Sequence, residues 1–168
     1  SKEIDLIKAG KKIPLHLLKK FLPFQKKSTS NTIEDFKALF LILSGHTGKT
    51  LGLKLADEQE IVMDLSDILS EIYIIDSLNL RVQKLANMEN TNPEELAIKE
   101  SILKLHLYMC RQKINEKAIT ILDSLESTKN KRILSKIIKL LTKKQATNPT
   151  LLRREIAKYF IEKGGYKW

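Results

Sequence analysis

Residues 57–85 read DEQEIVMDLSDILSEIYIIDSLNLRVQKL, and this stretch decides the fold. Its apolar side chains recur mostly at steps of three and four residues, which is the period of an amphipathic helix and not of a strand. The acidic start suits the positive end of a helix, with Asp57 as the expected N-cap and Glu60 able to reach back to it. We therefore predict one long helix from Asp57 to about Met88. Its predicted inward positions are Ile61, Leu65, Ile68, Leu69, Ile72, Ile75, Leu78, Val82 and Leu85.

Signals for four more helices flank this stretch. Thr32 is the expected N-cap of a helix that precedes it. Asn92 and Pro93 fit the cap and the first helical position of the next helix, and a second Thr-Asn-Pro at 147–149 begins the last one, which ends at Gly164-Gly165. The expected ranges are about 32–55, 92–124, 128–144 and 148–163.

These helices are also amphipathic. The inward positions are Leu96, Leu103, Leu107, Cys110, Ile114, Ile121 and Leu125 on the third helix, and Ile133, Leu134, Ile137, Ile138 and Leu141 on the fourth. Only 6 Gly and 4 Pro in 168 residues leave too few turns for an all-β or doubly wound fold. We predict an all-α antiparallel bundle of four to five amphipathic helices, residues 28–168, preceded by a basic amphipathic arm or connector, residues 1–27.

The composition limits the cellular setting. Cys110 is the single cysteine, which excludes an internal disulfide and favours a buried structural thiol. No segment resembles a secretory signal, and no apolar run approaches the ~20 residues that span a bilayer. We expect a cytoplasmic protein of bacterial type, peripheral to the membrane if membrane-associated at all. The chain begins at Ser1 without a methionine, so we expect a processed or excised piece of a longer protein.

The stretch SGHTGKT, residues 44–50, resembles half of a nucleotide-binding phosphate loop. Such a loop needs four residues between its glycines, whereas two separate Gly45 from Gly48, and Leu43 stands where the first glycine belongs. Gly45, Gly48 and Gly52 are instead three and four residues apart, which places them on one face of a helix. We predict that this strip lets a neighbouring helix approach closely.

No catalytic or metal-binding pattern stands out. His16, His46 and His106 are far apart, and none stands three or four residues from a carboxylate in a metal-ligand pattern. The acidic pairs Asp64/Asp67 and Glu71/Asp76 are interpreted as solvated faces or caps. We predict no catalytic, cofactor-binding or metal-ligating residues in this chain.

The net charge of +10 is concentrated in two places. The amino-terminal arm carries an apolar face beside lysines, which suits a membrane interface, although packing on a larger body is the favoured alternative. A basic stripe follows one side of the fourth helix and is interpreted first as a solvated face, then as a lipid or protein contact, with nucleic acid least favoured. The candidate contact residues are Leu15, Leu18, Lys19, Lys20, Phe21 and Leu22 in the arm, and Lys129, Arg132, Lys136, Lys139 and Lys143 in the stripe.

Several stretches resemble the C-terminal part of acyl-CoA dehydrogenases, especially the long bacterial enzymes related to the very-long-chain type. The stretches are KLADEQEIVMDLSDIL at 54–69, EIYIIDSLNLRVQKL at 71–85, LRREIAK at 152–158, GYKW at 165–168 and IKAGKKIPL at 7–15. The similarity covers nearly the whole chain.

The resemblance implies that the flavin-binding and catalytic body lies upstream of this chain. The family's Tyr-Glu-Gly-Thr-like catalytic segment and its flavin contacts do not occur here, so the resemblance implies no activity for this piece alone. It implies FAD in the parent protein and a role in fatty-acid β-oxidation. For this piece it implies packing against the catalytic body, support of dimer organisation and, as in the very-long-chain relatives, membrane association. The alternative is a stand-alone basic helical module that binds an anionic membrane surface or nucleic acid.

Overall fold

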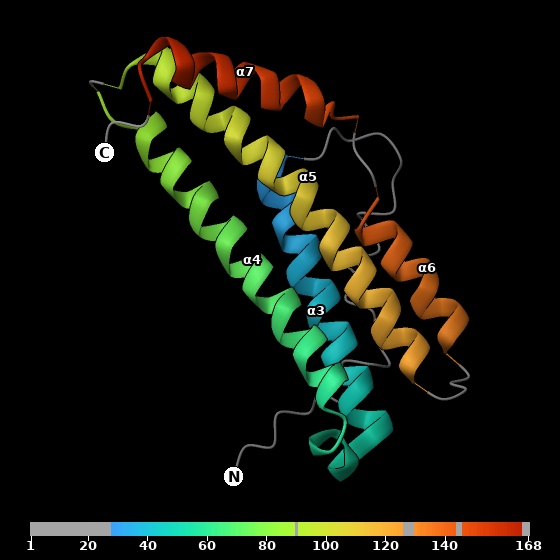
Figure 1. Cartoon of the computed structure of the whole chain (residues 1–168). Helices are drawn as coiled ribbons and strands as arrows, with labels where there is room; N and C mark the ends of the chain where they lie inside the picture. The colour runs from blue at the N-terminus through green and yellow to red at the C-terminus, as the bar shows by residue number, and fades with distance from the viewer. Residues whose placement is uncertain (1–27, 90, 126–129, 144–145, 166–168) are drawn as a thin grey trace.

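The structure is a computed structural model that describes residues 28–89, 91–125, 130–143 and 146–165. This part of the chain forms five α-helices and one 3-10 turn and contains no strand, which confirms the predicted all-α fold (Figure 1). The elements are α3 (Thr29–Leu51), η1 (Gly52–Ala56), α4 (Gln59–Ala86), α5 (Pro93–Ser124), α6 (Lys131–Leu141) and α7 (Pro149–Glu162). The predicted arm, residues 1–27, lies outside the described residues.

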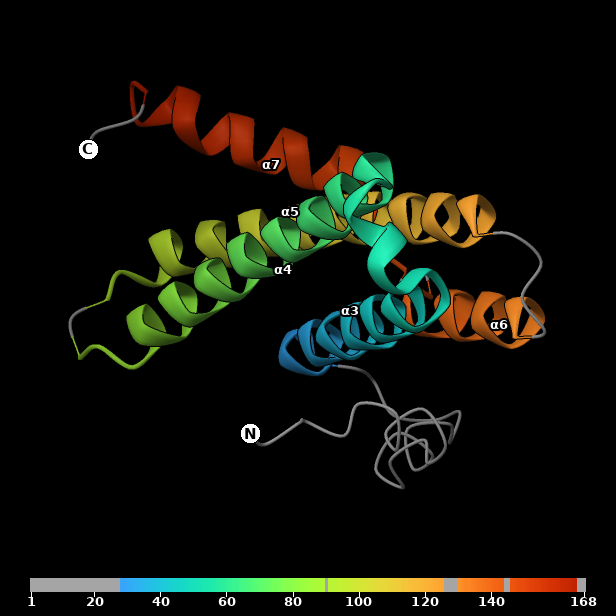
Figure 2. The ribbon, with the colours of Figure 1, turned by 90° about the horizontal axis from the view of Figure 1, so that it is seen from below.

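The two long helices α4 and α5 lie side by side (Figure 1). Figure 2 shows α3 and α6 on one side of this pair and α7 on the other. The helix α5 contacts α3, α4, α6 and α7, whereas α7 packs against α5 and against no other described helix. The core therefore lies among α3, α4, α5 and α6.

Long aliphatic side chains fill this core. Phe36 and Leu39 of α3, Ile75 of α4, and Ile114 and Ile121 of α5 are fully buried. Burying one such side chain stabilises the fold by about 1.5–3 kcal/mol, which makes this cluster the main source of stability. The short helix α6 closes the cluster with Leu134, Ile138 and Leu141.

Two of the predicted helix starts are confirmed by their hydrogen bonds. The Oδ1 atom of Asn92 accepts a hydrogen bond of 2.9 Å from the backbone N–H of Glu94. Asn148 does the same for Thr150 and Leu151, at 3.1 and 3.2 Å. Both helices have proline at the first turn, as the repeated Thr-Asn-Pro predicted.

The predicted start of the first helix is wrong by a few residues. Its N-cap is Ser28, whose Oγ accepts from the backbone N–H of Asn31 at 3.2 Å. Thr32 lies inside the first turn, where it is buried and its hydroxyl donates to the carbonyl of Ser28. Ser28 and Thr32 both suit a cap, and the burial of Thr32 against the core decides between them.

The junction between α3 and α4 also differs from the prediction. The α-helix ends at Leu51, because Gly52 adopts a φ of 56° and a ψ of −126°, which a helix cannot contain. A 3-10 turn then leads to α4, which begins at Gln59 after Glu58, without a side-chain hydrogen bond at its cap. The predicted cap Asp57 instead closes the turn, with its N–H donating to the carbonyl of Lys54.

Two residues that the periodicity placed inward are exposed. Leu69 on α4 is 49% exposed and Ile133 on α6 is 56% exposed. Each directly adjoins a buried neighbour, Ile68 or Leu134, and successive residues point about 100° apart around a helix. A helix therefore buries one of the two, and Leu69 becomes part of the surface described below.

The close packing predicted at the glycine strip is not made by the described part of the chain. A Cβ placed on Gly45, Gly48 or Gly52 meets no atom within 4 Å, so no described helix uses this strip. Gly52 is explained by its positive φ, which stops α3. Gly45 and Gly48 lie inside α3, and their packing against anything beyond the described residues stays a prediction.

Substitution by alanine separates these roles. Gly45→Ala and Gly48→Ala should each raise the free energy of unfolding of the isolated chain by up to about 1 kcal/mol, because alanine is the better helix former and its Cβ meets open space. Gly52→Ala should lower it by about 1–3 kcal/mol, because alanine is strained at that φ. Urea unfolding measures all three. A clear loss of stability on replacing Gly45 or Gly48 would show that a partner does pack there.

Candidate functional site

The described residues contain no cluster of three or more His, Cys, Asp or Glu side chains that could hold a metal ion. His46 and His106 belong to no cluster of this kind, and the Nε2 atom of each is buried without a hydrogen-bond partner. His16 lies outside the described residues. Burial, and then the charge of Lys49, lowers the pKa of His46. Cys110 is buried as predicted, and burial raises its pKa to about 12, so the thiol is protonated at neutral pH.

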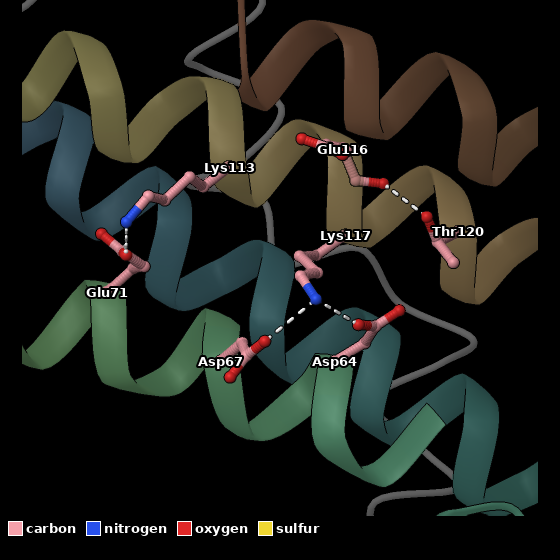
Figure 3. A network of polar contacts seen from close by, with 7 residues as sticks. All are labelled: Asp64, Asp67, Glu71, Lys113, Glu116, Lys117 and Thr120. Carbon is pink, nitrogen blue, oxygen red and sulfur yellow. Dashed lines mark hydrogen bonds and ion pairs between the residues drawn. The ribbon is translucent and has the colours of Figure 1, made fainter. Parts of the chain in front are cut away.

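A network of polar contacts links α4 to α5 (Figure 3). The Nζ atom of Lys117 lies 2.7 Å from Asp64 and 2.9 Å from Asp67, and Lys113 lies 2.5 Å from Glu71. These ion pairs correct the sequence interpretation of solvated faces or caps for Asp64 and Glu71, which are mostly buried, whereas Asp67 is exposed as that interpretation expected. Hydrogen bonds to the two aspartates raise the pKa of Lys117 above its ordinary value.

A groove of about 340 Å³ lies along this network and is lined by residues of α4 and α5. Its two lysines already contact carboxylates on the opposite helix, so most of its charge is neutralised from within. Such an arrangement fixes the register of two helices and offers a ligand little unpaired charge. We therefore assign the network a structural role.

The predicted basic stripe is divided by the structure. Arg132, Lys136, Lys139 and Lys143 are all exposed on α6 and its end, whereas Lys129 lies outside the described residues. Lys139 and Lys143 line a second groove, of about 310 Å³, between α5 and α6. Arg132 and Lys136 do not line it. The basic stripe is therefore two surfaces: Arg132 and Lys136 lie outside the groove, and Lys139 and Lys143 lie at the groove.

Sequence reasoning missed one residue in this second groove. Arg111 of α5 lines the groove and is only 5% exposed, although arginine is rarely buried. A signal was present, because Arg111 stands four residues after Leu107 and three before Ile114, both of which are on the predicted inner face.

An apolar stripe runs along the exposed side of α4. Its members are spaced by seven, four and seven residues, which places them on one line of the helix. Val62, Leu69, Tyr73 and Leu80 form the stripe, and Tyr73 is 73% exposed. No described helix covers it.

The neighbouring helix α3 extends this apolar surface. Two contacts join α3 to α4: Ser30 with Gln83 at 3.2 Å and Lys37 with Asp76 at 2.9 Å. The second contact is seven residues later on α3 and seven residues earlier on α4, so the two helices are antiparallel. This antiparallel register places Leu41, which is 62% exposed, beside the Tyr73 region of α4. Leu41 and the α4 stripe together are called the α3–α4 face below.

None of the described helices has the length and the apolar character needed to cross a bilayer. The described part of the chain is thus an all-helical domain with paired charges inside, an uncovered apolar face and a cationic groove.

Comparison with known proteins identifies the family. Residues 35–140, which run from α3 into α6, match the family model described as acyl-CoA dehydrogenase, C-terminal domain. The chain therefore belongs to this family, which confirms the resemblance found in its sequence. No curated protein matches the chain.

A solved structure shares the fold. The crystal structure of an acyl-CoA dehydrogenase complexed with FAD from Bacillus anthracis superimposes with a TM-score of 0.82 at 23% sequence identity. The match covers 99% of this chain but 29% of that one, so the chain corresponds to less than a third of the length of this neighbour. At this identity the likeness shows the fold alone.

The ion pairs of Lys117 can be tested by removing the charge. Lys117→Met should lower the free energy of unfolding by about 1 kcal/mol, because it leaves Asp64, which is mostly buried, without its cation. The control Lys104→Met removes an exposed lysine 3.6 Å from Glu100 and should cost about 0.3 kcal/mol or less.

The pH dependence of this stabilisation follows from the raised pKa of Lys117. The stabilisation by the Lys117 ion pairs is complete below pH 10.5, the ordinary pKa of lysine. It is lost as the pH rises through the higher pKa of Lys117 in the folded protein. Urea unfolding at neutral pH and above pH 10.5 measures it. Equal losses for both variants at neutral pH would contradict the assigned role.

Proposed function

We propose that this chain is the non-catalytic C-terminal helical domain of an acyl-CoA dehydrogenase-like flavoenzyme of fatty-acid β-oxidation, and that it packs against a catalytic body supplied by the rest of that protein. The uncovered α3–α4 face is the observation that carries the proposal. Monomeric soluble domains rarely leave a contiguous apolar patch of this kind without a partner. Membership of a C-terminal domain family and the 29% coverage of the structural neighbour support the catalytic body as that partner.

FAD and the acyl-CoA chemistry belong, in this proposal, to the parent protein. The chain stabilises the parent protein by burying its α3–α4 face against the catalytic body. In this way it also supports the dimer organisation of the parent protein. The contacts of Ser30 with Gln83 and of Lys37 with Asp76 keep the α3–α4 face in one register, so that it presents a single surface to its partner. Rigid surfaces bind at a smaller cost in conformational entropy.

Membrane association is a further part of the proposed function. The amino-terminal arm pairs an apolar face of Leu15, Leu18, Phe21 and Leu22 with Lys19 and Lys20, and a basic amphipathic segment of this type binds anionic lipid through both features. The stand-alone alternative, a basic module on a membrane surface or nucleic acid, shares the basic arm but gives no reason for the apolar α3–α4 face.

The coding sequence upstream of Ser1 is the direct test of the parent. We expect an open reading frame with a Tyr-Glu-Gly-Thr-like segment before Ser1, and a purified full-length protein that retains flavin. A frame without that segment would overturn the proposal.

Docking of the α3–α4 face can be tested in the full-length protein. The double variant Leu69→Asp plus Tyr73→Asp should lower the temperature at which the domain separates from the body, because two charges enter an apolar interface. In the isolated chain both positions are exposed, so the free energy of unfolding should change by less than about 0.5 kcal/mol. Calorimetry of both proteins measures this. The control Ile161→Asp changes an exposed residue of α7 and should leave both transitions in place.

Liposome flotation tests the arm. The isolated chain should float with vesicles that contain anionic lipid and remain unbound with neutral vesicles, because each lysine near an anionic surface contributes about 1 kcal/mol. Lys19→Glu plus Lys20→Glu should abolish flotation, whereas the control Lys104→Glu plus Lys158→Glu should preserve it. Unchanged binding by the arm variant would show that the arm is not the anchor.

A further inference from the structure

The groove between α5 and α6 differs in charge from the groove between α4 and α5. Arg111, Lys139 and Lys143 line it, and no acidic residue does. In the α4–α5 groove, by contrast, Lys113 and Lys117 contact carboxylates of the opposite helix. Of these two similar grooves, only the one between α5 and α6 has a cationic lining that is not neutralised by its own side chains.

Arg111 is the buried part of this lining. Its guanidinium lies over the ring of Phe36, with Cζ 5.9 Å from the ring centre. Its Nε and Nη2 atoms are buried and have no hydrogen-bond partner among the described residues. Buried charged groups are almost always hydrogen bonded, because the loss of water otherwise costs several kcal/mol. These two nitrogens have almost no exposed surface, so Arg111 offers an anion in the groove its positive charge and the part of its side chain that lines the groove.

The charge state of Arg111 fits this role. Burial lowers its pKa, while the negative charge of Asp35, a buried neighbour on α3, opposes that shift. Arginine remains protonated at neutral pH in proteins even when it is buried. The groove thus holds a permanent positive charge on a side chain that is buried against Phe36, where an anion is attracted more strongly than at an exposed lysine.

Two neutral side chains of α5 supply further donors. Tyr108 accepts a hydrogen bond of 3.1 Å from Gln112, which leaves its own hydroxyl hydrogen free to donate. Asn115 accepts through Oδ1 from the hydroxyl of Thr142 at 2.7 Å, which leaves its NH₂ group as a donor. The lining therefore combines three cations with neutral donors.

Lys139 and Lys143 complete the site from α6 and its end. Lys139 lies on α6 and Lys143 lies two residues beyond its end, and both line the groove and are exposed. Flexible ammonium groups at the rim can close over an anion that contacts the guanidinium below. A fork of guanidinium donors with surrounding ammonium groups is the donor set that proteins use for phosphate.

We propose that the groove between α5 and α6 binds a phosphate group, held by Arg111, Lys139 and Lys143 with Tyr108 and Asn115 as neutral donors. The phosphate belongs either to a free phosphate ester or to the headgroup of an anionic phospholipid. The site lies on α5 and α6, away from the α3–α4 face, so it does not depend on docking of a catalytic body.

Titration of the isolated chain with inorganic phosphate, at constant ionic strength kept with chloride, tests the site. Saturable shifts of amide resonances should be centred on residues 108–115 and 139–143, and the melting temperature should rise with phosphate because the ligand binds the folded state. Lys139→Ala plus Lys143→Ala should weaken binding about tenfold or more, since each lost charge-assisted contact is worth about that factor.

The matched control is Arg132→Ala plus Lys136→Ala, which removes the same charge from the same helix outside the groove. It should bind phosphate within about twofold of wild type, the residual effect of long-range charge. Equal weakening by both double variants, or shifts that never saturate, would overturn the proposal and leave only general attraction to a basic surface.

Arg111→Met gives an independent measurement. Without phosphate this variant should melt at a lower temperature than wild type, because it leaves the buried Asp35 without its nearby positive charge and the ring of Phe36 without the guanidinium. Added phosphate should then no longer raise its melting temperature. A variant that is still stabilised by phosphate as strongly as wild type would contradict the role of Arg111.

Vesicles identify the source of the phosphate. Phosphatidylglycerol vesicles should bind the chain more weakly in the Lys139/Lys143 variant than in the Arg132/Lys136 control if the ligand is a lipid headgroup. Intact binding of inorganic phosphate without any such difference on vesicles assigns a free phosphate ester. Failure of both measurements rejects the site.

Discussion

The arrangement depends on one constraint: α5 is in contact with each of the other four described α-helices. A helix that is covered from several sides cannot have one apolar and one polar face, so its polar residues must find partners inside the domain. Ser101 donates to Glu155 of α7 at 3.1 Å, and Lys113 and Lys117 contact carboxylates of α4. The many polar residues of α5 thus connect it to different neighbours.

The same constraint separates the surfaces of the domain. One side of α4 is covered by α5. The apolar stripe of α4 therefore faces outward beside α3. On the far side of α5, the short α6 leaves Arg111 between the core and a groove that is lined by cations and open to solvent. An apolar face and a cationic groove therefore arise on opposite flanks of one central helix and can serve different partners.

Much of the fold could be predicted from the sequence, because apolar periodicity and Asn-Pro caps are local signals. The helices and the buried Cys110 followed from them, whereas the family followed from the resemblance of particular stretches such as residues 54–69. The start of α3 at Ser28 could not be predicted, because Ser28 and Thr32 both suit the N-cap. The end of α3 at Gly52 could not be predicted either, because the backbone angles of Gly52 decide it. The ion pairs of Asp64 and Asp67 also stayed hidden, since their partner Lys117 is 50 or more residues away. Exposure of Leu69 and burial of Arg111 depend in the same way on which neighbours the helices acquire.

The terminal helix α7 has a thermodynamic consequence of its own. None of its residues is buried, and polar contacts such as that between Lys163 and Glu94, at 3.0 Å, tie it to α5. Its attachment therefore adds little to the cooperative unit formed by α3 to α6, and it can detach while that unit remains folded. We therefore expect the domain to behave as two foldons of unequal stability. Whatever meets the outer side of α5 competes with a helix that is held by only a small free energy.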